Sequence, residues 1–352
     1  MWTKKFNQLS KNDIAIAGGK GASLGEMAQA GFPVPPGFVV VAAAFERFLA
    51  ETDLNVEVAA IFKKVNYKDI NSVDKASNQI RDLIADVKFP QDIGKEIIKE
   101  YRELFKIKLP HLNPPLAKGR RKSARENLVA VRSSATAEDS SVASWAGELE
   151  SYLNVDEAGL LGAVKKCWSS LFTPRAIFYR FEKNLHEQKV LVAVVVQAMV
   201  QSEVSGIVFT AHPVTEDRNQ MVIEAGWGLG EAVVGGLITP DTYVVDKTAL
   251  RPALRRRLRQ GKQAQGVKKA ILDKNISEQV MMIVRQGSGT TKVAVEKEKQ
   301  GKQKLADKQI IELAKICQKI EAHYNFPQDI EWALAGNNFY ILQSRPITTL
   351  KI

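Results

Sequence analysis

The spacing of apolar residues divides the chain into a helical region and a region rich in strands. From Ala42 to Phe105, apolar residues such as Ile93, Ile97 and Tyr101 recur at helical intervals, which predicts amphipathic helices. A second helical pattern runs from Leu305 to Tyr324. Short apolar runs bounded by turn residues predict strands, and they occupy residues 128–131, 190–200, 206–210, 221–225 and 241–246. Together these patterns predict an α+β fold.

The segment from Pro327 to Thr348 is predicted to be a β-hairpin, because Gly336-Asn337-Asn338 stands between two alternating strands. We expect a three-residue loop, since this register pairs the polar residues of the two strands with one another. The expected pairs are Ala335 with Phe339, Glu331 with Gln343, and Asp329 with Arg345. A two-residue loop would instead set Glu331 opposite Ser344.

Strand side chains alternate between two faces, so one face of this hairpin gathers polar groups. The first strand contributes Asp329, Glu331 and Ala333 to that face. The return strand is expected to add Phe339, Ile341, Gln343 and Arg345. Carboxylate and amide oxygens suit Mg²⁺, and a guanidinium suits a phosphate. The alternative is a solvent-facing hairpin held by salt bridges.

A second candidate phosphate site lies near the N-terminus. Gly18 and Gly19 precede Lys20 and a helix predicted from Ala22 to Ala30, with Gly31 in the left-handed conformation that ends helices. Glycines let the backbone approach a ligand closely, and a helix N-terminus offers N–H groups to an anion. Lys20 would add a mobile positive charge. The alternative is a plain glycine turn before a helix.

Two polar residues are associated with strands that we expect to be buried, one at the end of a strand and one inside a strand. Arg132 follows the strand at 128–131 and precedes a run of small hydroxylated residues, which can wrap a phosphate with Arg132 as a bidentate anchor. An ordinary polar loop is the alternative. Gln197 interrupts an apolar strand that we expect to be buried on both faces. A buried amide needs partners, and either an adenine edge or a neighbouring backbone group would serve.

Composition limits the classes of protein to consider. With 352 residues, of which 45% are hydrophobic, the chain can bury a core large enough for two lobes. A net charge of +11 suits a polyanionic partner such as a nucleoside triphosphate, nucleic acid or acidic protein. Cys167 and Cys317 lack the spacing of a zinc site or disulfide scaffold. The chain begins without a hydrophobic signal core and has no apolar run that could span a bilayer, so we expect a cytoplasmic protein.

Several common nucleotide-binding motifs are absent from the sequence. The glycines at 226–230 do not have the GxGxxG spacing, and neither a P-loop nor the protein-kinase signatures occur. Residues 251–269 carry eight basic side chains, no acidic one and no aromatic ring on which a base could stack. We therefore expect a solvated loop or hairpin there and regard nucleic-acid binding as unsupported elsewhere in the chain.

Five separated motifs resemble, in the same order, the nucleotide-binding domain of phosphoenolpyruvate synthases. They are AGGKGASLGEM, AVRSSATAED, SGIVFTAHPVT, WGLGEAVVGG and PQDIEWA…YILQSRPIT. The pattern is shared with pyruvate phosphate dikinase and rifampin phosphotransferase and covers nearly the whole chain. The resemblance implies an ATP-grasp-like fold with ATP in a cleft between two lobes. The first lobe would span residues 1–190, and the second, residues 191–352, would include the long apolar strand and the C-terminal hairpin.

The resemblance also implies roles for individual residues around ATP and Mg²⁺. These are Lys20 and Arg132 at the phosphates, Arg345 at the transferring phosphate, Gln197 at the adenine, Gly147 and Ser151 lining the pocket, and Glu331 and Gln343 at Mg²⁺ with Asp329 in support. The sequence departs from the family pattern at Gly21, where asparagine is usual, and at Ser151, where threonine is common.

Members of this family pass a phosphoryl group from ATP to a histidine on a separate swivelling domain. None of the histidines, His111, His186, His212 and His323, lies in a segment that resembles that domain, and His212 falls in an expected turn. The resemblance therefore implies an ATP-dependent phosphotransferase half that works with a histidine domain in trans or in a longer parent chain. The alternatives are a non-catalytic nucleotide-binding regulatory module, or the ATP-binding half of a rifampin-phosphotransferase-like enzyme.

Overall fold

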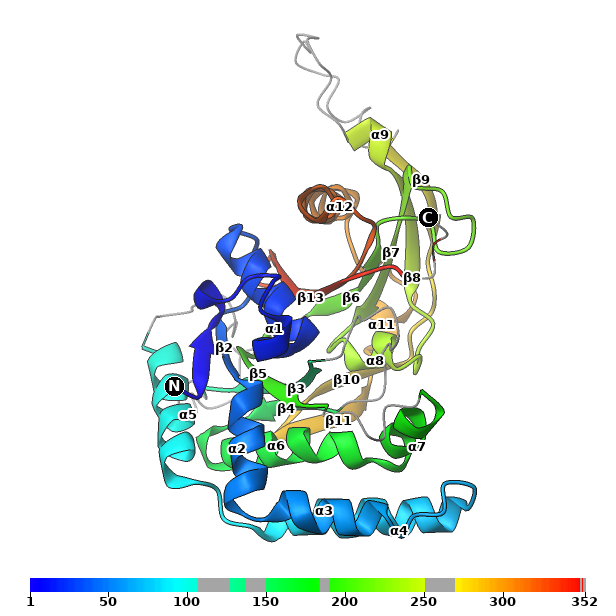
Figure 1. Ribbon diagram of the computed structural model, residues 1–352. Coiled ribbons are helices and arrows are strands. Elements are labelled where there is room, and N and C mark those ends of the chain that lie inside the picture. The colour runs from blue at the N-terminus through cyan, green and yellow to red at the C-terminus, as the bar shows by residue number, and fades with distance from the viewer. Residues whose placement is uncertain (107–126, 137–149, 184–189, 251–269, 349, 351–352) are drawn as a thin grey trace.

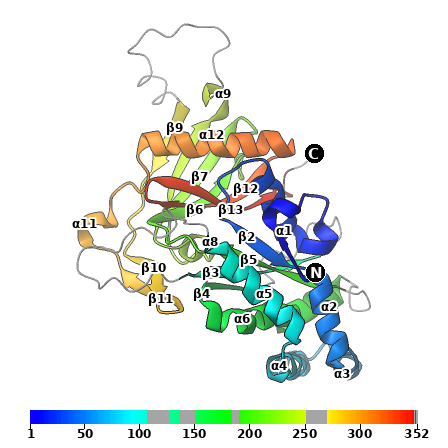
Figure 2. The same cartoon turned by 90° about the vertical axis from the view of Figure 1, so that its left-hand side faces the viewer.

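The computed structural model describes residues 1–106, 127–136, 150–183, 190–250, 270–348 and 350. These residues form a five-stranded sheet, a six-stranded sheet and a separate two-stranded hairpin. Helix α1 lies between the two larger sheets, and the other long helices cover their outer sides (Figure 1 and Figure 2). This mixture of helices and sheets agrees with the predicted α+β class. No helix in the described part of the chain is long and apolar enough to cross a membrane.

The first sheet is antiparallel throughout its paired strands and has the order β1-β2-β5-β3-β4. In that order the strands are Thr3–Lys5, Gly37–Val40, Val192–Ala198, Val129–Ala135 and Ser151–Val155. The helices beside it are α2 (Ala42–Glu51), α3 (Leu54–Phe62), α4 (Ile70–Asp86), α5 (Gln91–Leu104), α6 (Glu157–Ser169) and α7 (Pro174–Glu182), with short 3-10 turns at Phe6–Gln8 and Ser170–Phe172. The predicted helical region is therefore confirmed, and it covers one face of this sheet.

Strand β5 is buried on both faces, as its continuous apolar sequence predicted. Val194 and Val196 belong to the core that the sheet shares with the helical layer, where Trp168 is fully buried. Ala193 and Val195 face the opposite way and join a core that includes α1 and the second sheet. Alternate residues of one strand thus connect two separate hydrophobic cores.

The second sheet is also antiparallel and has the order β13-β12-β6-β7-β8-β9. In that order the strands are Asn338–Pro346, Gln328–Ala335, Val204–Phe209, Gln220–Trp227, Asp241–Asp246 and Ile271–Asn275. Helix α12 (Asp307–Tyr324) packs against one face through Ile310, Leu313 and Cys317. The remaining elements are α8 (Glu231–Val234), α9 (Lys247–Leu250), α11 (Lys297–Gln300) and the hairpin of β10 (Met281–Gln286) and β11 (Gly289–Ala294).

The predicted boundary at residue 190 would put β5 in the second lobe, residues 191–352, whereas the strand lies in the first sheet. This strand pairs with β2 on one edge and with β3 on the other. Without β5, the first sheet would fall into two separate strand pairs, β1 with β2 and β3 with β4. A strand that is apolar on both faces belongs at the centre of a sheet, so the first sheet is completed only at Ala198. The division into two lobes itself stays a prediction.

Helix α1 (Ile14–Gln29) is interrupted at Gly18, whose φ of 67° and ψ of 172° are not helical. The part that lies between the sheets therefore begins at Gly19 rather than at the predicted Ala22. It ends as predicted, because Gly31 has a φ of 78° and the N–H of Phe32 donates to the carbonyl of Met27 at 3.0 Å.

Gly18→Ala is expected to lower the free energy of unfolding by about 2 kcal/mol or more, because the backbone conformation at Gly18 is almost exclusive to glycine. A Cβ at this position would lie 2.2 Å from Oγ of Ser134, so β3 would have to move away from α1. Urea denaturation would measure the loss. Gly162→Ala is the matched control, because Gly162 lies inside α6 with no atom within 4 Å of an added Cβ. That variant should gain about 0.5–1 kcal/mol, and equal losses in both variants would contradict the prediction.

Candidate functional site

The C-terminal hairpin has the predicted polar pairs but reaches them by a different route. Asp329 pairs with Arg345 and Glu331 with Gln343, as expected. Near the turn, however, Ala335 pairs with Asn338, so the loop has two residues and not three. A β-bulge restores the register, because Trp332 pairs with Ile341 while the next residue, Glu331, pairs with Gln343. Leu342 is the extra residue on the return strand.

The bulge corrects the predicted faces of the return strand. We expected Phe339 and Ile341 to share a face with Gln343. They lie instead on the opposite face, with Trp332 in the core under α12. The rings of Trp332 and Phe339 meet edge to face, with their centroids 5.7 Å apart. One strand can therefore present apolar residues to the core before the bulge and polar residues to the opposite face after it.

Arg132 joins the two sheets at this polar face. Its Nη2 donates to Oε2 of Glu331 at 2.6 Å and to Oε1 of Gln343 at 3.0 Å. Its Nη1 donates to the carbonyl oxygen of Leu342 at 3.0 Å. The Arg132 side chain is only 13% exposed and that of Glu331 is 22% exposed. Three residues that lie about 200 positions from Arg132 in sequence thus converge on one guanidinium.

Arg345 and Asp329 form a second pair on the same hairpin. Nε and Nη2 of Arg345 lie 2.8 and 2.7 Å from Oδ2 of Asp329. Burial raises the pKa of the Asp329 carboxyl above its usual range, the Arg345 guanidinium opposes this shift, and the Glu331 carboxylate adds to it. The contacts with Asp329 fix the orientation of the Arg345 side chain.

The first sheet brings three of the expected residues to one face. Arg132 pairs with Ser151 on β4 and with Val195 on β5, and Gln197 pairs with Ala130. Directly paired residues point to the same side of a sheet, so Arg132, Ser151 and Gln197 share a face. Gln197 is almost completely buried, and its Nε2 donates to the carbonyl of Pro35 at 3.3 Å, which is the backbone partner foreseen as an alternative to adenine.

The serine run after Arg132 begins inside β3 and not in a loop. Oγ of Ser133 donates to the carbonyl of Glu150 at 2.7 Å, and Oγ of Ser134 donates to that of Ala17 at 2.9 Å. These two hydroxyls therefore hold β4 and α1 against β3, which corrects the expectation that they wrap a phosphate. Gly147 and the residues of that run after Thr136 lie outside the described residues.

Lys20 lies in the first turn of the helix that follows Gly18. The backbone N–H of Gly21 donates to Oγ of Ser134 at 3.2 Å, so the start of this helix is anchored to β3. One turn later, Oγ of Ser23 donates to the carbonyl of Ser344 on β13 at 2.8 Å. Residues three apart share a helix face, so Lys20 lies on the face that meets β13. The close approach that Gly18 permits is to Ser134 rather than to a ligand.

Glu224 is an acidic residue at this face that the sequence analysis did not identify. It pairs with Ile207, which pairs in turn with Glu331, so the two glutamates lie in one row across β7, β6 and β12. Burial, together with the charge of Asp329, raises the pKa of its carboxyl. The available signal was a glutamate inside the apolar run MVIEAGW.

The donor atoms of this face suit Mg²⁺. No group of three or more histidine, cysteine, aspartate or glutamate side chains able to hold a metal occurs among the residues that the structure describes. Oxygens of Glu331 and Gln343, however, lie within hydrogen-bond distance of one nitrogen, Nη2 of Arg132, and so converge on one point. Mg²⁺ is commonly bound by one or two protein carboxylates, with water and substrate phosphates completing the shell. Glu331 and Gln343 fit such a site.

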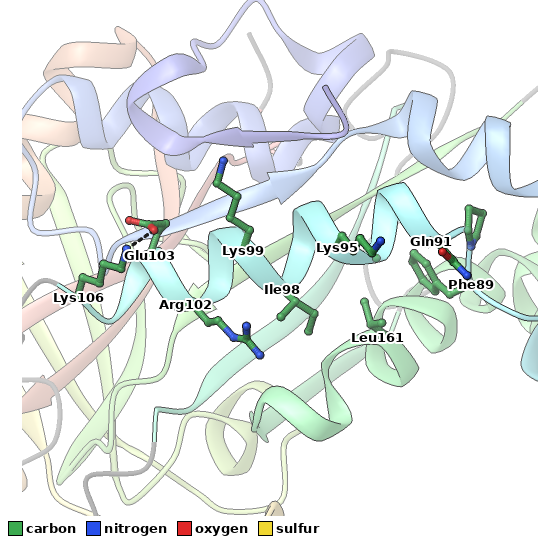
Figure 3. A pocket seen from close by; sticks show the side chains of 11 residues that line it. Phe89, Gln91, Lys95, Ile98, Lys99, Arg102, Glu103, Lys106 and Leu161 are labelled. Atoms are coloured by element: carbon green, nitrogen blue, oxygen red, sulfur yellow. Dashed lines mark hydrogen bonds and ion pairs between the residues drawn. The ribbon is translucent and has the colours of Figure 1, made fainter.

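One groove of the molecule lies away from this face. A groove of about 570 Å³ between α5 and α6 has an apolar floor that includes Ile98 and Leu161, and Lys95, Lys99 and Arg102 also line it (Figure 3). None of the expected site residues that the structure describes is part of its lining. Ser151, in contrast, lines a pocket of about 370 Å³ next to β4 and α6.

The two histidines in the described part of the chain each contact neighbouring groups of the protein. Nδ1 of His212 accepts hydrogen bonds from the backbone N–H groups of Val214 and Thr215 at 3.3 and 3.2 Å. His212 thus organises a turn, as expected from its motif. His323 lies on α12, and its Nε2 is 2.7 Å from Oε1 of Glu26 on α1.

Comparison with known proteins identifies the family of the chain. Residues 14–352 match the family described as pyruvate phosphate dikinase, AMP/ATP-binding domain. The chain belongs to this family. This AMP/ATP-binding domain is 44% identical over 348 residues to a probable phosphoenolpyruvate synthase of Methanocaldococcus jannaschii. The match covers 98% of this chain and 26% of the relative.

Two further relatives extend the comparison. The domain is 40% identical over 390 residues to a phosphoenolpyruvate synthase of Pyrococcus furiosus, with 99% of this chain and 44% of the relative covered. It is 36% identical over 348 residues to a rifampicin phosphotransferase of Bacillus subtilis, with 98% of this chain and 36% of the relative covered. The AMP/ATP-binding domain therefore spans less than half the length of each of these relatives.

Proposed function

We propose that this chain binds Mg-ATP between its two sheets and donates a phosphoryl group to a histidine on a domain outside it. The observation that carries the proposal is the contact of Arg132, from the first sheet, with Glu331 and Gln343 of the second. This contact brings a phosphate-binding cation and the metal-binding oxygens to one place. The proposal includes an ATP-grasp-like arrangement, in which the two sheets form lobes on either side of the nucleotide.

The relatives support this class of reaction. Those named phosphoenolpyruvate synthase share the whole of this domain, and its family is named for AMP and ATP binding. Since more than half of each relative lies beyond the shared region, a histidine domain would belong to that remainder or act in trans. The rifampicin phosphotransferase shares the same region. The final acceptor is therefore a property of the other domains, whether it is pyruvate or an antibiotic hydroxyl.

Phosphoryl transfer from ATP needs neutralised charge and a fixed geometry more than it needs covalent help from the protein. Lys20 on α1, Arg132 on β3 and Arg345 on β13 would bind the phosphates from three sides. Asp329 would keep Arg345 oriented through the contacts of 2.8 and 2.7 Å. Glu331 and Gln343 would hold Mg²⁺, which neutralises phosphate charge when bound.

The base would lie along β5, near Gln197. Gln197 is two residues from Val195, the partner of Arg132, so it is about 7 Å further along the sheet. Ser151 pairs directly with Arg132 on the other side. This arrangement would separate an adenine end near Gln197 from a phosphate end near Arg132.

Glu331→Gln is expected to weaken ATP binding about tenfold or more in the presence of Mg²⁺ and to have a much smaller effect in EDTA, because the nearly isosteric change keeps the shape of the side chain and removes the charge of a metal ligand. Calorimetric titration with ATP and with AMP would measure both effects. Glu203→Gln is a suitable control, since Glu203 is exposed and accepts only from the Gly336 N–H among the hydrogen bonds of its carboxylate that the structure describes. Equal affinity of the unmodified chain for AMP and ATP, without magnesium dependence, would remove the phosphate and metal sites.

A further inference from the structure

Arg132 holds the same two oxygens that the proposed function assigns to Mg²⁺. Both Oε2 of Glu331 and Oε1 of Gln343 accept hydrogen bonds from Nη2, at 2.6 and 3.0 Å. The guanidinium lies at the point where the two oxygens converge, and a cation shared by these oxygens would have to lie there as well. Arg132 and Mg²⁺ would therefore have to occupy the same position.

Simultaneous occupation is excluded by size and charge. Mg²⁺ binds oxygens at about 2.1 Å and demands a nearly octahedral shell, whereas Nη2 and its hydrogen already fill the space in front of both oxygens. Two positive groups within about 3 Å of each other would also repel strongly, the more so at a face that is largely shielded from water. The Arg132 and Glu331 side chains are 13% and 22% exposed.

We propose that Arg132 and the divalent cation exchange at Glu331 and Gln343, and that the triphosphate of ATP drives the exchange by drawing Arg132 away. This inference rests on the proposed function. Phosphate oxygens are good bidentate acceptors for a guanidinium. Hydrogen bonds from Arg132 to the phosphates would therefore replace the one that it loses to the Glu331 carboxylate. The metal alone offers no such compensation and must displace the arginine unaided.

The position of Arg132 makes the exchange consequential for the whole domain. Arg132 belongs to β3 of the first sheet, while its acceptors belong to β12 and β13 of the second. Loading the site therefore replaces a direct bond between the sheets with bonds through the nucleotide. The remaining bond, to the Leu342 carbonyl at the bulge, is to a neutral acceptor and so opposes the movement less.

The test measures binding of Mn²⁺ alone to the full chain, by electron paramagnetic resonance of the free ion. Arg132→Gln and Arg132→Met should each bind Mn²⁺ at least about tenfold more tightly than the unmodified chain, because they remove the competing charged hydrogen bonds. Measurement in about 0.5 M KCl shortens the range of general charge effects to about 4 Å. Arg81→Gln is the matched control, since it removes one positive charge from the pair of Arg81 with Glu150 and leaves Glu331 and Gln343 in place. This control should bind Mn²⁺ as weakly as the unmodified chain.

A second measurement follows the coupling between metal and nucleotide. In the unmodified chain ATP should strengthen Mn²⁺ binding, and in the Arg132 variants that factor should fall by about tenfold or more, since there is no arginine left to displace. Mn²⁺ affinity that depends on Glu331 but is the same with and without Arg132 would overturn the exchange and leave the proposed function intact. Absence of Mn²⁺ binding in every variant, even with ATP present, would overturn the metal site and the exchange together.

Discussion

Lys304→Met is expected to lower the free energy of unfolding by about 3–5 kcal/mol, the cost of leaving a buried charge without its partner. Nζ of Lys304 lies 2.8 Å from Oδ1 of Asp241, and both side chains have 0% exposure. Asp241 also accepts from the Tyr243 hydroxyl at 2.7 Å and from the backbone N–H groups of Ser277 and Lys304 at 3.0 and 2.9 Å. Its carboxylate would keep these neutral donors but lose the only cation described beside it.

Lys274→Met provides the comparison for that loss. Lys274 lies 2.8 Å from Asp307, the same separation as in the buried pair, but the two side chains are 35% and 36% exposed. An exposed pair contributes less than about 1 kcal/mol, because water screens the charges and both side chains lose rotamer freedom. Urea denaturation of both variants would compare them directly. Similar losses in the two variants would show that the buried network does not stabilise the second sheet.

Arg345→Ala is expected to slow phosphoryl transfer to an added histidine domain by about 100-fold or more, as loss of a single charge-stabilising donor does in other enzymes. Such a histidine domain would come from a related synthase. Without it, the chain should bind ATP yet show almost no turnover to AMP and no stable phosphohistidine. Labelled ATP followed by alkaline phosphoamino-acid analysis would measure both reactions.

Arg47→Ala serves as the control for this experiment, because Arg47 lies on α2 and pairs with Glu51 and Asp92 away from the site. It should transfer phosphate at the unmodified rate. Robust labelling of His212 in the isolated chain would contradict the assignment of a separate histidine domain. The structure argues against such labelling, because Nδ1 of His212 is already engaged by the backbone of its own turn.

Much of the fold followed from periodicity, because burial of one face imposes a regular spacing on both helices and strands. The helices between Ala42 and Phe105 and the helix before the last hairpin are confirmed. The sheet to which β5 belongs could not be predicted in this way. Which neighbours a strand pairs with depends on contacts between distant segments, and nothing in the local pattern of Val192–Ala198 distinguishes the first sheet from the second.

The candidate site shows the same limit on a smaller scale. The pairs of Asp329 with Arg345 and of Glu331 with Gln343 were predicted, whereas the two-residue loop and the bulge were not. The shorter loop shifts the register by one residue, and the bulge shifts it back by one. The predicted pairs are therefore correct although the predicted loop is not. Glu224 was missed because it comes from a strand that is distant in sequence from β12 and joins Glu331 only through β6. The resemblance placed Arg132, Glu331 and Gln343 around one nucleotide, but the direct contacts of Arg132 across the sheets were not predicted.

The bulge at Leu342 also isolates the tip of the hairpin from its functional end. Changes at Gly336 and Asn337 act on the register only up to the bulge, beyond which the pairing of Glu331 with Gln343 is set separately. A cysteine at the exposed Asn338 would therefore carry a dye without disturbing those residues. It would also react selectively, because Cys167 and Cys317 are buried and burial raises the pKa of both thiols. The hairpin thus provides a reporter position from which movement between the sheets can be followed in the otherwise unmodified chain.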